Sequence, residues 1–182
     1  MDHVVSLLGA EDLDPFAHHL ARQAGESGRY GLPVFNPFEP GHAWEAADIR
    51  ARRESLWSTS PGARGWGRTW GIHDGASIVG HAEVEGSGIE ADQHRVRLGM
   101  GVERVYHRRG MGRALLDACL RWCEREPVVD WVDLGVFAHN RPALELYLAL
   151  GFEEVGRAAD RFRVAGERIT DVQLVRFVGR DV

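Results

Sequence analysis

Apolar positions along the chain change their spacing several times, and each change predicts a new element. Residues 4–8 form a short apolar run that is typical of a strand. Apolar residues then recur at helical spacing over 13–24 and again over 44–56, which predicts two helices. Between them, residues 31–41 contain three prolines and two glycines, and this composition indicates a loop.

The middle of the chain follows the two-residue period of β-strands. Residues 66–73 and 77–85, separated by a short turn, predict a β-hairpin. Residues 94–102 alternate again, with four apolar side chains on one face and two glycines, Gly99 and Gly101, on the other. Because glycine weakens a strand, we expect these two residues to mark a bulge or the close approach of a ligand.

After Gly112 the apolar period becomes that of an amphipathic helix packed against a sheet. A strand over 132–136, a helix over 140–150 and two final strands over 152–164 and 169–177 complete the pattern. The predicted order is β-α-α-β-β-β-α-β-α-β-β. This order predicts an α/β (α+β) fold in which helices cover both faces of a mixed sheet.

Length and charge narrow the class of protein. The 182 residues suit one domain, and a chain with 44% hydrophobic and 27% charged residues has an ordinary globular composition. No apolar run is long enough to cross a bilayer, and the first residues lack the basic start and apolar stretch of a secretory signal. We therefore expect a cytoplasmic protein that binds no membrane. The formal net charge of −5 does not favour nucleic acid as a partner.

The choice of basic residues and cysteines excludes several chemistries. The chain contains no lysine, so all 22 residues counted as Lys or Arg are arginines. This excludes a pyridoxal-phosphate Schiff base and a P-loop lysine. Cys119 and Cys123 are spaced to lie on one helix face, and two ligands are too few for a structural zinc ion. We expect both to face the core, and we expect no metal site.

The turn that follows residues 94–102 combines glycines with a short basic cluster. Its residues are His107, Arg108, Arg109, Gly110, Met111, Gly112 and Arg113. Glycines that open a helix directly after a strand leave backbone N–H groups pointing outward, and the helix N-terminus adds partial positive charge. We expect an anion here, and a pyrophosphate fits best. The alternatives are a plain helix start with solvated arginines, or a dinucleotide site, whose third glycine is replaced by Leu115.

A second stretch has a fixed spacing of polar, small and aromatic residues. It consists of Asn140, Ala143, Tyr147, Gly151 and Phe152. Together the two stretches resemble the GCN5-related N-acetyltransferases, the GNAT superfamily. That family's pyrophosphate loop reads Gln/Arg-x-x-Gly-x-Gly/Ala, and its later helix reads Asn-x-x-Ala-x-x-x-Tyr-x-x-x-Gly-Phe. The later pattern is matched here at every fixed position, and the resemblance is strongest over residues 96–156.

The resemblance implies a fold and an activity. The fold would be that of acyl-CoA N-acyltransferases, with a mixed, mostly antiparallel sheet flanked by helices. A single domain over 1–182 would divide into an acceptor-side half over 1–92, an acetyl-CoA-binding half over 93–156 and a closing hairpin over 157–182. Acetyl-CoA would be the cosubstrate, and a primary amine on a small molecule or protein N-terminus would accept the acetyl group directly. Family members are often dimers, so a homodimer is a candidate assembly.

The resemblance also implies roles for individual residues. It places the CoA pyrophosphate on the backbone of the glycine turn and the thioester beside Met100 and Val102. Asn140, with Ala143, would help to hold the pantetheine arm, although Asn140 is also a good helix N-cap. Tyr147 would protonate the departing thiolate. A half-buried core tyrosine is the structural alternative.

The sequence leaves two questions about the site: the effect of His107 at the first position of the motif, and the identity of the base. His107 stands where the family has Gln or Arg, so a permanent charge is lost there, and Arg108 and Arg109 can compensate. The base that takes the proton of the amine has three candidates, Glu83, Glu85 and His94, of which Glu83 lies in a strand expected to flank the site.

Other functions fit the same residues. The domain could bind CoA as a sensor without catalysis, or it could use a different acyl-CoA. A nucleotide-phosphate binder that uses the glycine turn alone leaves the match over 140–152 unexplained. The acidic residues Glu39, Glu45 and Asp48 indicate either a cationic amine as acceptor or a solvated face.

Overall fold

One seven-stranded sheet, in the order β1-β2-β3-β4-β5-β7-β6, organises the computed structural model, which describes residues 3–179. The strands are β1 (Val5–Leu7), β2 (Gly67–Asp74), β3 (Ser77–Gly86), β4 (Arg95–Val102), β5 (Trp131–Phe137), β6 (Glu153–Val164) and β7 (Glu167–Phe177). The helices are α1 (Leu13–Ala24), α2 (Ala46–Ser58), α3 (Met111–Cys123) and α4 (Arg141–Ala149), with short 3₁₀ helices η1 (Ala10–Asp12), η2 (Glu90–Asp92) and η3 (Arg104–Tyr106). All eleven predicted helices and strands are thus confirmed.

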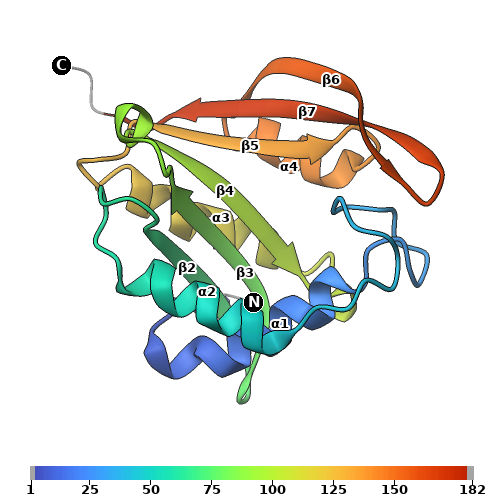
Figure 1. The fold of residues 1–182 in the computed structure, drawn as a ribbon, viewed down its shortest axis with the longest axis horizontal. Coiled ribbons are helices and arrows are strands. Elements are labelled where there is room, and N and C mark those ends of the chain that lie inside the picture. Colours follow the sequence, from blue (N-terminus) through green and yellow to red (C-terminus); the bar gives the residue numbers. More distant parts are fainter. Residues whose placement is uncertain (1–2, 180–182) are drawn as a thin grey trace.

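The sheet opens between its two central strands. Neighbouring strands pair antiparallel throughout, except that β4 and β5 pair parallel. That parallel pairing covers only residues 95–97 of β4 against 131–133 of β5. Figure 1 shows the two strands diverging beyond this point. We call the opening between Leu98–Val102 of β4 and the rest of β5 the wedge.

Helices cover both faces of the sheet, as predicted. A Cβ atom added at Gly80 would meet Leu115 of α3 at 3.2 Å, whereas one added at Gly101 would meet Gln23 of α1 at 2.5 Å. These two glycines mark opposite faces, with α3 and α4 on one and α1 and α2 on the other (Figure 1). Cys119 and Cys123 of α3 are fully buried free thiols, which confirms that they face the core.

The segment between α1 and α2 reaches across to the far end of the sheet. His139 lies with its Nε2 atom 2.6 Å from the carbonyl oxygen of Val34, and the N–H group of Ala165 donates to the carboxylate of Glu39. Val34 also packs in a small core with Val164 and Ile169. In Figure 1 this blue loop lies beside the turn between β6 and β7. The loop therefore closes one side of the wedge.

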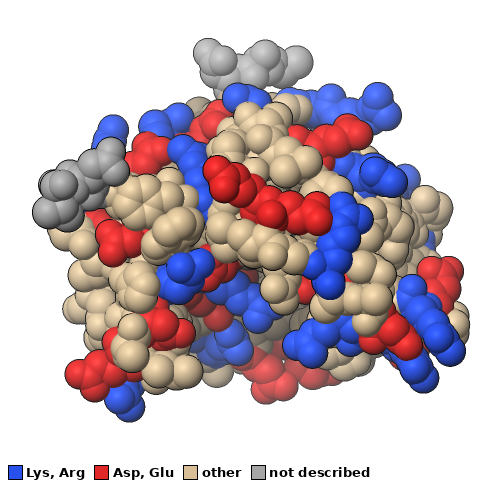
Figure 2. All heavy atoms as spheres, turned by 90° about the horizontal axis from the view of Figure 1, so that it is seen from above, with Lys and Arg blue, Asp and Glu red and all other residues tan. Residues whose placement is uncertain are grey.

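The surface carries both charges in alternation. Figure 2 shows basic and acidic side chains interleaved over the face that it presents, and every basic one is an arginine because the chain has no lysine. Within residues 3–179, no helix has the length and apolar character needed to span a membrane.

Candidate active site

The glycine turn between β4 and α3 adopts a backbone that favours glycine. Gly110 is the N-cap of α3 and has φ 80°, and Arg108 has φ 60°, so both lie in the left-handed region. Left-handed backbone costs a residue with a Cβ about 1–2 kcal/mol, which explains the glycine at position 110.

The backbone of this turn is rich in free donors. Within the described chain, none of the N–H groups from Arg108 to Arg113 donates a hydrogen bond. The first helical bond of α3 runs from the Ala114 N–H to the Gly110 carbonyl at 3.1 Å. Free N–H groups at a helix N-terminus form a site for an anion such as a phosphate. The geometry therefore supports the pyrophosphate site expected from the sequence.

Two side chains of the turn do not point toward that guest. The ring of His107 turns back toward β4, with Nε2 2.8 Å from the carbonyl oxygen of Val102. Arg109 donates from Nη2 to the Val105 carbonyl at 3.0 Å and lies over the ring of Tyr106. The basic cluster is thus partly committed to holding the turn in shape.

The two motifs of the sequence meet beside the wedge. The apolar face of β4, which carries Met100 and Val102, is turned toward α3 and packs against the main core. A Cβ atom at Gly112 would meet the Met100 Cε at 3.1 Å and Leu146 of α4 at 3.5 Å. The N-terminus of α3, strand β4 and helix α4 therefore converge at Gly112. The β5-facing backbone edge of residues 98–102 has no strand partner in the described chain, because β5 pairs only with residues 95–97.

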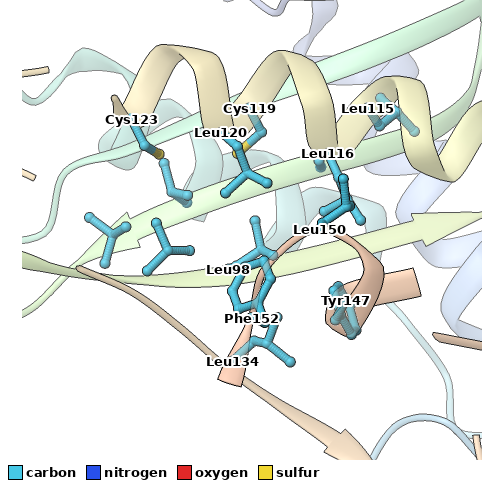
Figure 3. Packing of buried hydrophobic residues seen from close by; sticks show 14 of the residues in the cluster. Leu98, Leu115, Leu116, Cys119, Leu120, Cys123, Leu134, Tyr147, Leu150 and Phe152 are labelled. Carbon is cyan, nitrogen blue, oxygen red and sulfur yellow. The ribbon is translucent and has the colours of Figure 1, made fainter. Parts of the chain in front are cut away.

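Tyr147 projects from α4 into this region. It is 7% exposed and packs edge-on against Phe152, with ring centroids 5.7 Å apart. Figure 3 shows it at one side of the apolar cluster beneath α3. Its hydroxyl makes no hydrogen bond within residues 3–179. Burial raises the pKa of Tyr147 well above its ordinary value, so the hydroxyl carries its proton at neutral pH.

Asn140 caps the helix that carries Tyr147. Its Oδ1 atom accepts from the Ala143 N–H at 3.4 Å, and a proline follows in the first turn. The expected N-cap is confirmed.

Glu83 lies on the opposite face of the sheet, under α1 and α2. It pairs with Gly99 in the β3–β4 ladder, and its carboxylate lies 3.1 Å from where a Cβ of Gly99 would stand. Its side chain is 13% exposed and lies 2.9 Å from Nη2 of Arg53. Burial raises the pKa of Glu83, and the charge of Arg53 offsets part of that rise.

The other two candidate bases are less suited to the role. Burial works to raise the pKa of Glu85, but its ion pairs with Arg53 and Arg52 outweigh burial and lower it. His94 is exposed and precedes β4 at the end where β4 and β5 are paired. It lies about 26 Å along the strand from Val102, at about 3.3 Å per residue. Of the three candidates, Glu83 alone combines burial, a raised pKa and a place beside the unpaired part of β4.

The two glycines of β4 are explained by the protein itself. The β3–β4 ladder has no register shift, so the expected bulge is absent there. Instead, the side chains of Glu83 and Gln23 occupy the space beside Gly99 and Gly101. The close approach is therefore made by the chain's own residues on that face.

Several buried polar residues were missed by the sequence reasoning. His19 and Gln23 lie on the buried stripe of α1 with Phe16, and His81 lies on β3. The signal was present, because residues 16, 19 and 23 recur at helical spacing and so share one face. Polar residues at core positions of a helix are the informative exceptions.

Two cavities adjoin the glycine turn on its other side. One, of about 630 Å³, is lined by His3, Asp74 and Tyr106 among others. The second, of about 510 Å³, runs along α3 beside β1. Both therefore lie on the β1 side of the turn, away from the wedge.

Comparison with known proteins agrees with this arrangement. The model of the acetyltransferase (GNAT) family matches residues 33–152. The L-amino acid N-acetyltransferase AaaT of Escherichia coli is 30% identical over 79 residues, which are 43% of this chain and 49% of that protein. The N-alpha-acetyltransferase RimI of Mycobacterium tuberculosis is 33% identical over 100 residues, which are 53% of this chain and 58% of that protein. The chain thus spans about half the length of these curated relatives.

Solved structures share the fold at low identity. A GNAT-family acetyltransferase from Streptococcus pneumoniae has a TM-score of 0.80 at 16% identity, covering 98% of this chain and 100% of that one. The putative acetyltransferase yncA from Salmonella typhimurium, solved with its cofactor acetyl-CoA, has a TM-score of 0.77 at 12% identity, covering 100% and 97%. Because the family model matches well over half of the chain and the fold agrees over nearly all of it, this protein belongs to the GNAT acetyltransferase family.

Proposed function

We propose that this protein is an acetyl-CoA-dependent N-acetyltransferase that transfers an acetyl group directly to a primary amine. The observation that carries the proposal is the run of free N–H groups from Arg108 to Arg113, set at the end of β4 where the wedge opens. Membership of the GNAT family and the names of the two curated relatives support the same activity.

The residues present fit acetyl-CoA. The free N–H groups of the glycine turn suit the pyrophosphate. The unpaired edge of β4 between Leu98 and Val102 offers backbone groups to the pantetheine arm, with Asn140 and Ala143 on the α4 side. Acetyl-CoA supplies the thioester carbonyl that the amine attacks.

Two residues of this chain handle protons in the proposed reaction. Glu83 accepts the proton that the amine loses, because burial raises the pKa of its carboxyl group and so makes the carboxylate a stronger base. The hydroxyl of Tyr147 donates a proton to the departing thiolate, and burial keeps that hydroxyl protonated until then. The two groups lie on opposite faces of the sheet, on either side of the wedge.

The acceptor is proposed as a small-molecule or protein N-terminal amine. One relative is named for L-amino acids and the other for N-terminal α-amino groups, so both classes remain in the proposal. Residues 1–92 form the acceptor side in this proposal, residues 93–156 the acetyl-CoA side and residues 157–182 the closing hairpin. The contact of Glu39 with Ala165 gives that acidic residue a role in holding the acceptor-side loop. We also propose a homodimer, by analogy with the family.

Calorimetric titration with acetyl-CoA tests the proposal, with ATP and NAD as separate controls. Micromolar binding of acetyl-CoA alone, on the order of −8 kcal/mol, is the expected result. A panel of amino acids, small amines and short peptides then tests for release of CoA. Binding without turnover on any amine would favour a CoA-binding sensor domain, and turnover only with longer acyl-CoA substrates would change the acyl group. No binding of acetyl-CoA or CoA would overturn the proposal.

A further inference from the structure

Three ionisable residues form a hydrogen-bonded chain between α1 and the sheet. Nδ1 of His81, on β3, lies 2.9 Å from Nε2 of His19, on α1. Nδ1 of His19 lies 2.9 Å from Oε1 of Glu103, which follows β4. His19 is 0% exposed and His81 is 3% exposed, whereas the Glu103 side chain reaches the surface and is bonded there by Arg22. We call His81, His19 and Glu103 the histidine chain.

The hydrogen bonds fix the proton positions when both rings are neutral. An ionised carboxylate only accepts, so His19 carries its hydrogen on Nδ1 and donates it to Glu103. Nε2 of His19 must then accept from His81, which carries its hydrogen on Nδ1. Nε2 of His81 is left with a lone pair, because the one hydrogen bond of this ring within residues 3–179 is made by Nδ1. The chain thus ends in an unprotonated nitrogen at a buried residue.

His81, which carries this nitrogen, lies on the same face of β3 as Glu83. His81 pairs with Gly101 and Glu83 with Gly99, so both flank the unpaired part of β4. Residues two apart on a strand share a face and are separated by about 6.8 Å. Oε2 of Glu83 is also buried without an aligned hydrogen-bond donor, although Arg53 lies 2.9 Å away. The two side chains are therefore neighbours on one face of β3, at a spacing that one bridging water can span.

Burial shifts the pKa values of the two groups in opposite directions. Burial lowers the pKa of His81 well below its usual value and raises that of Glu83. Arg53 of α2 acts against a positive charge on His81, and Phe16 of α1 packs edge-on against its ring at 5.4 Å. Glu103 acts to raise the pKa of His19, against the larger effect of burial.

We propose that His81 takes the proton from Glu83 during acetyl transfer, and that His19 and Glu103 are positioning residues that keep Nε2 of His81 unprotonated beforehand. This inference rests on the proposed function. In the step, the O–H bond of protonated Glu83 breaks and an Nε2–H bond forms on His81. Glu83 returns to a carboxylate, and His81 becomes an imidazolium that still donates its Nδ1–H to His19. The imidazolium then loses the Nε2 proton to water after the product leaves.

Substitution of His81 by glutamine tests the step, because glutamine can bond His19 but cannot accept a proton. We expect His81→Gln to lower kcat at least tenfold at pH 7, with KM for acetyl-CoA within twofold of the parent. The pH profile of kcat in the parent should contain a limb caused by protonation of His81, and that limb should be absent from the variant. His73→Gln on β2 is the matched control, because His73 also lies beside a carboxylate, Asp12, at 3.2 Å. It should leave kcat and its pH profile unchanged.

Nitrogen-15 spectra of the histidine rings report where each ring carries its hydrogen, and in the parent protein they need neither turnover nor a substitution at His81. At pH 7.5, His19 and His81 should both carry their hydrogen on Nδ1, and Glu103→Ala should abolish this preference at His19. A hydrogen on Nε2 of His81 would overturn the inference, even if the glutamine variant failed to fold. A folded His81→Gln enzyme with unchanged kcat and pH profile would overturn it while leaving the acetyltransferase intact. A parent that acetylates no amine would instead remove the proposed function, and the inference with it.

Discussion

Replacing Gly101 with alanine tests how closely α1 is packed against β4. The backbone of Gly101 has no positive φ, so alanine fits the local conformation and only its methyl group matters. That methyl would stand 2.5 Å from Cδ of Gln23, 2.6 Å from its Oε1 and 2.8 Å from its Nε2. Non-bonded carbon atoms prefer about 3.5–4.0 Å, so the amide must move by about 1 Å.

The free-energy cost follows from two opposing effects. Overpacking of this kind costs about 1–3 kcal/mol, and the reduced freedom of the unfolded alanine chain returns about 0.4–1 kcal/mol. The net loss should be roughly 0.5–2 kcal/mol, which lowers the melting temperature of a chain of this length by roughly 1–8 °C. In a Gln23→Ala background the clash is gone, so the same Gly101→Ala change should be neutral or stabilising by up to about 1 kcal/mol.

Urea unfolding of the parent, the two single variants and the double variant measures this coupling. The sign of the Gly101→Ala effect should reverse between the two backgrounds. An equal loss of stability with and without the Gln23 amide would refute the packing argument, because it would place the cost somewhere other than the contact with α1.

Three further outcomes are expected. Tyr147→Phe should lower turnover at least tenfold with little change in acetyl-CoA affinity, measured by CoA release and calorimetry, and unchanged turnover would remove its role as the acid. Gly110→Ala places a Cβ at φ 80°, at a cost of about 1–2 kcal/mol, and should weaken acetyl-CoA binding. Gly65→Ala is the control: it places a Cβ at φ 73° in open space before the start of β2, and it should leave that affinity unchanged. Burial lowers the pKa of His19 and His81 below the ordinary histidine value near 6.5. The unfolded chain therefore binds more protons than the folded one as the pH falls through that value, and the free energy of unfolding should decrease between pH 7.5 and 5.5, by at most about 1.4 kcal/mol per histidine. A double glutamine variant should show a shallower pH dependence of the melting temperature, and an equal slope would contradict the argument.

The order of elements could be read from the sequence because it depends on local periodicity. The amphipathic pattern after Gly112 and the alternation over 94–102 each act within a few neighbouring residues. The wedge could not be read in this way, since it depends on the parallel pairing of β4 and β5 stopping after residue 97. A parallel pair joins strands that a helix separates, and no local pattern sets where the pair ends.

The candidate site likewise combines local motifs with contacts between residues that are far apart in the sequence. The glycine turn and the residues 140–152 are local motifs, and both were predicted. The partners of Glu83 were not, because Arg53 lies thirty positions earlier in the chain, on α2. The contact of His19 with His81 spans sixty-two positions, and it exists only once α1 is docked on the sheet. Local motifs therefore predict the glycine turn and the helix that follows β5, whereas the charged partners of Glu83 and His81 depend on the tertiary structure.

The all-arginine surface has a chemical consequence for the proposed use of acetyl-CoA. Lysine ε-amines are nucleophiles when neutral, and acetyl-CoA can acetylate them without any enzyme. A guanidinium group stays protonated at any physiological pH and offers no lone pair for that attack. Because the chain has 22 arginines and no lysine, it presents no lysine amine to the proposed cosubstrate. The interleaved charges of Figure 2 therefore include no basic side chain that a thioester would acetylate.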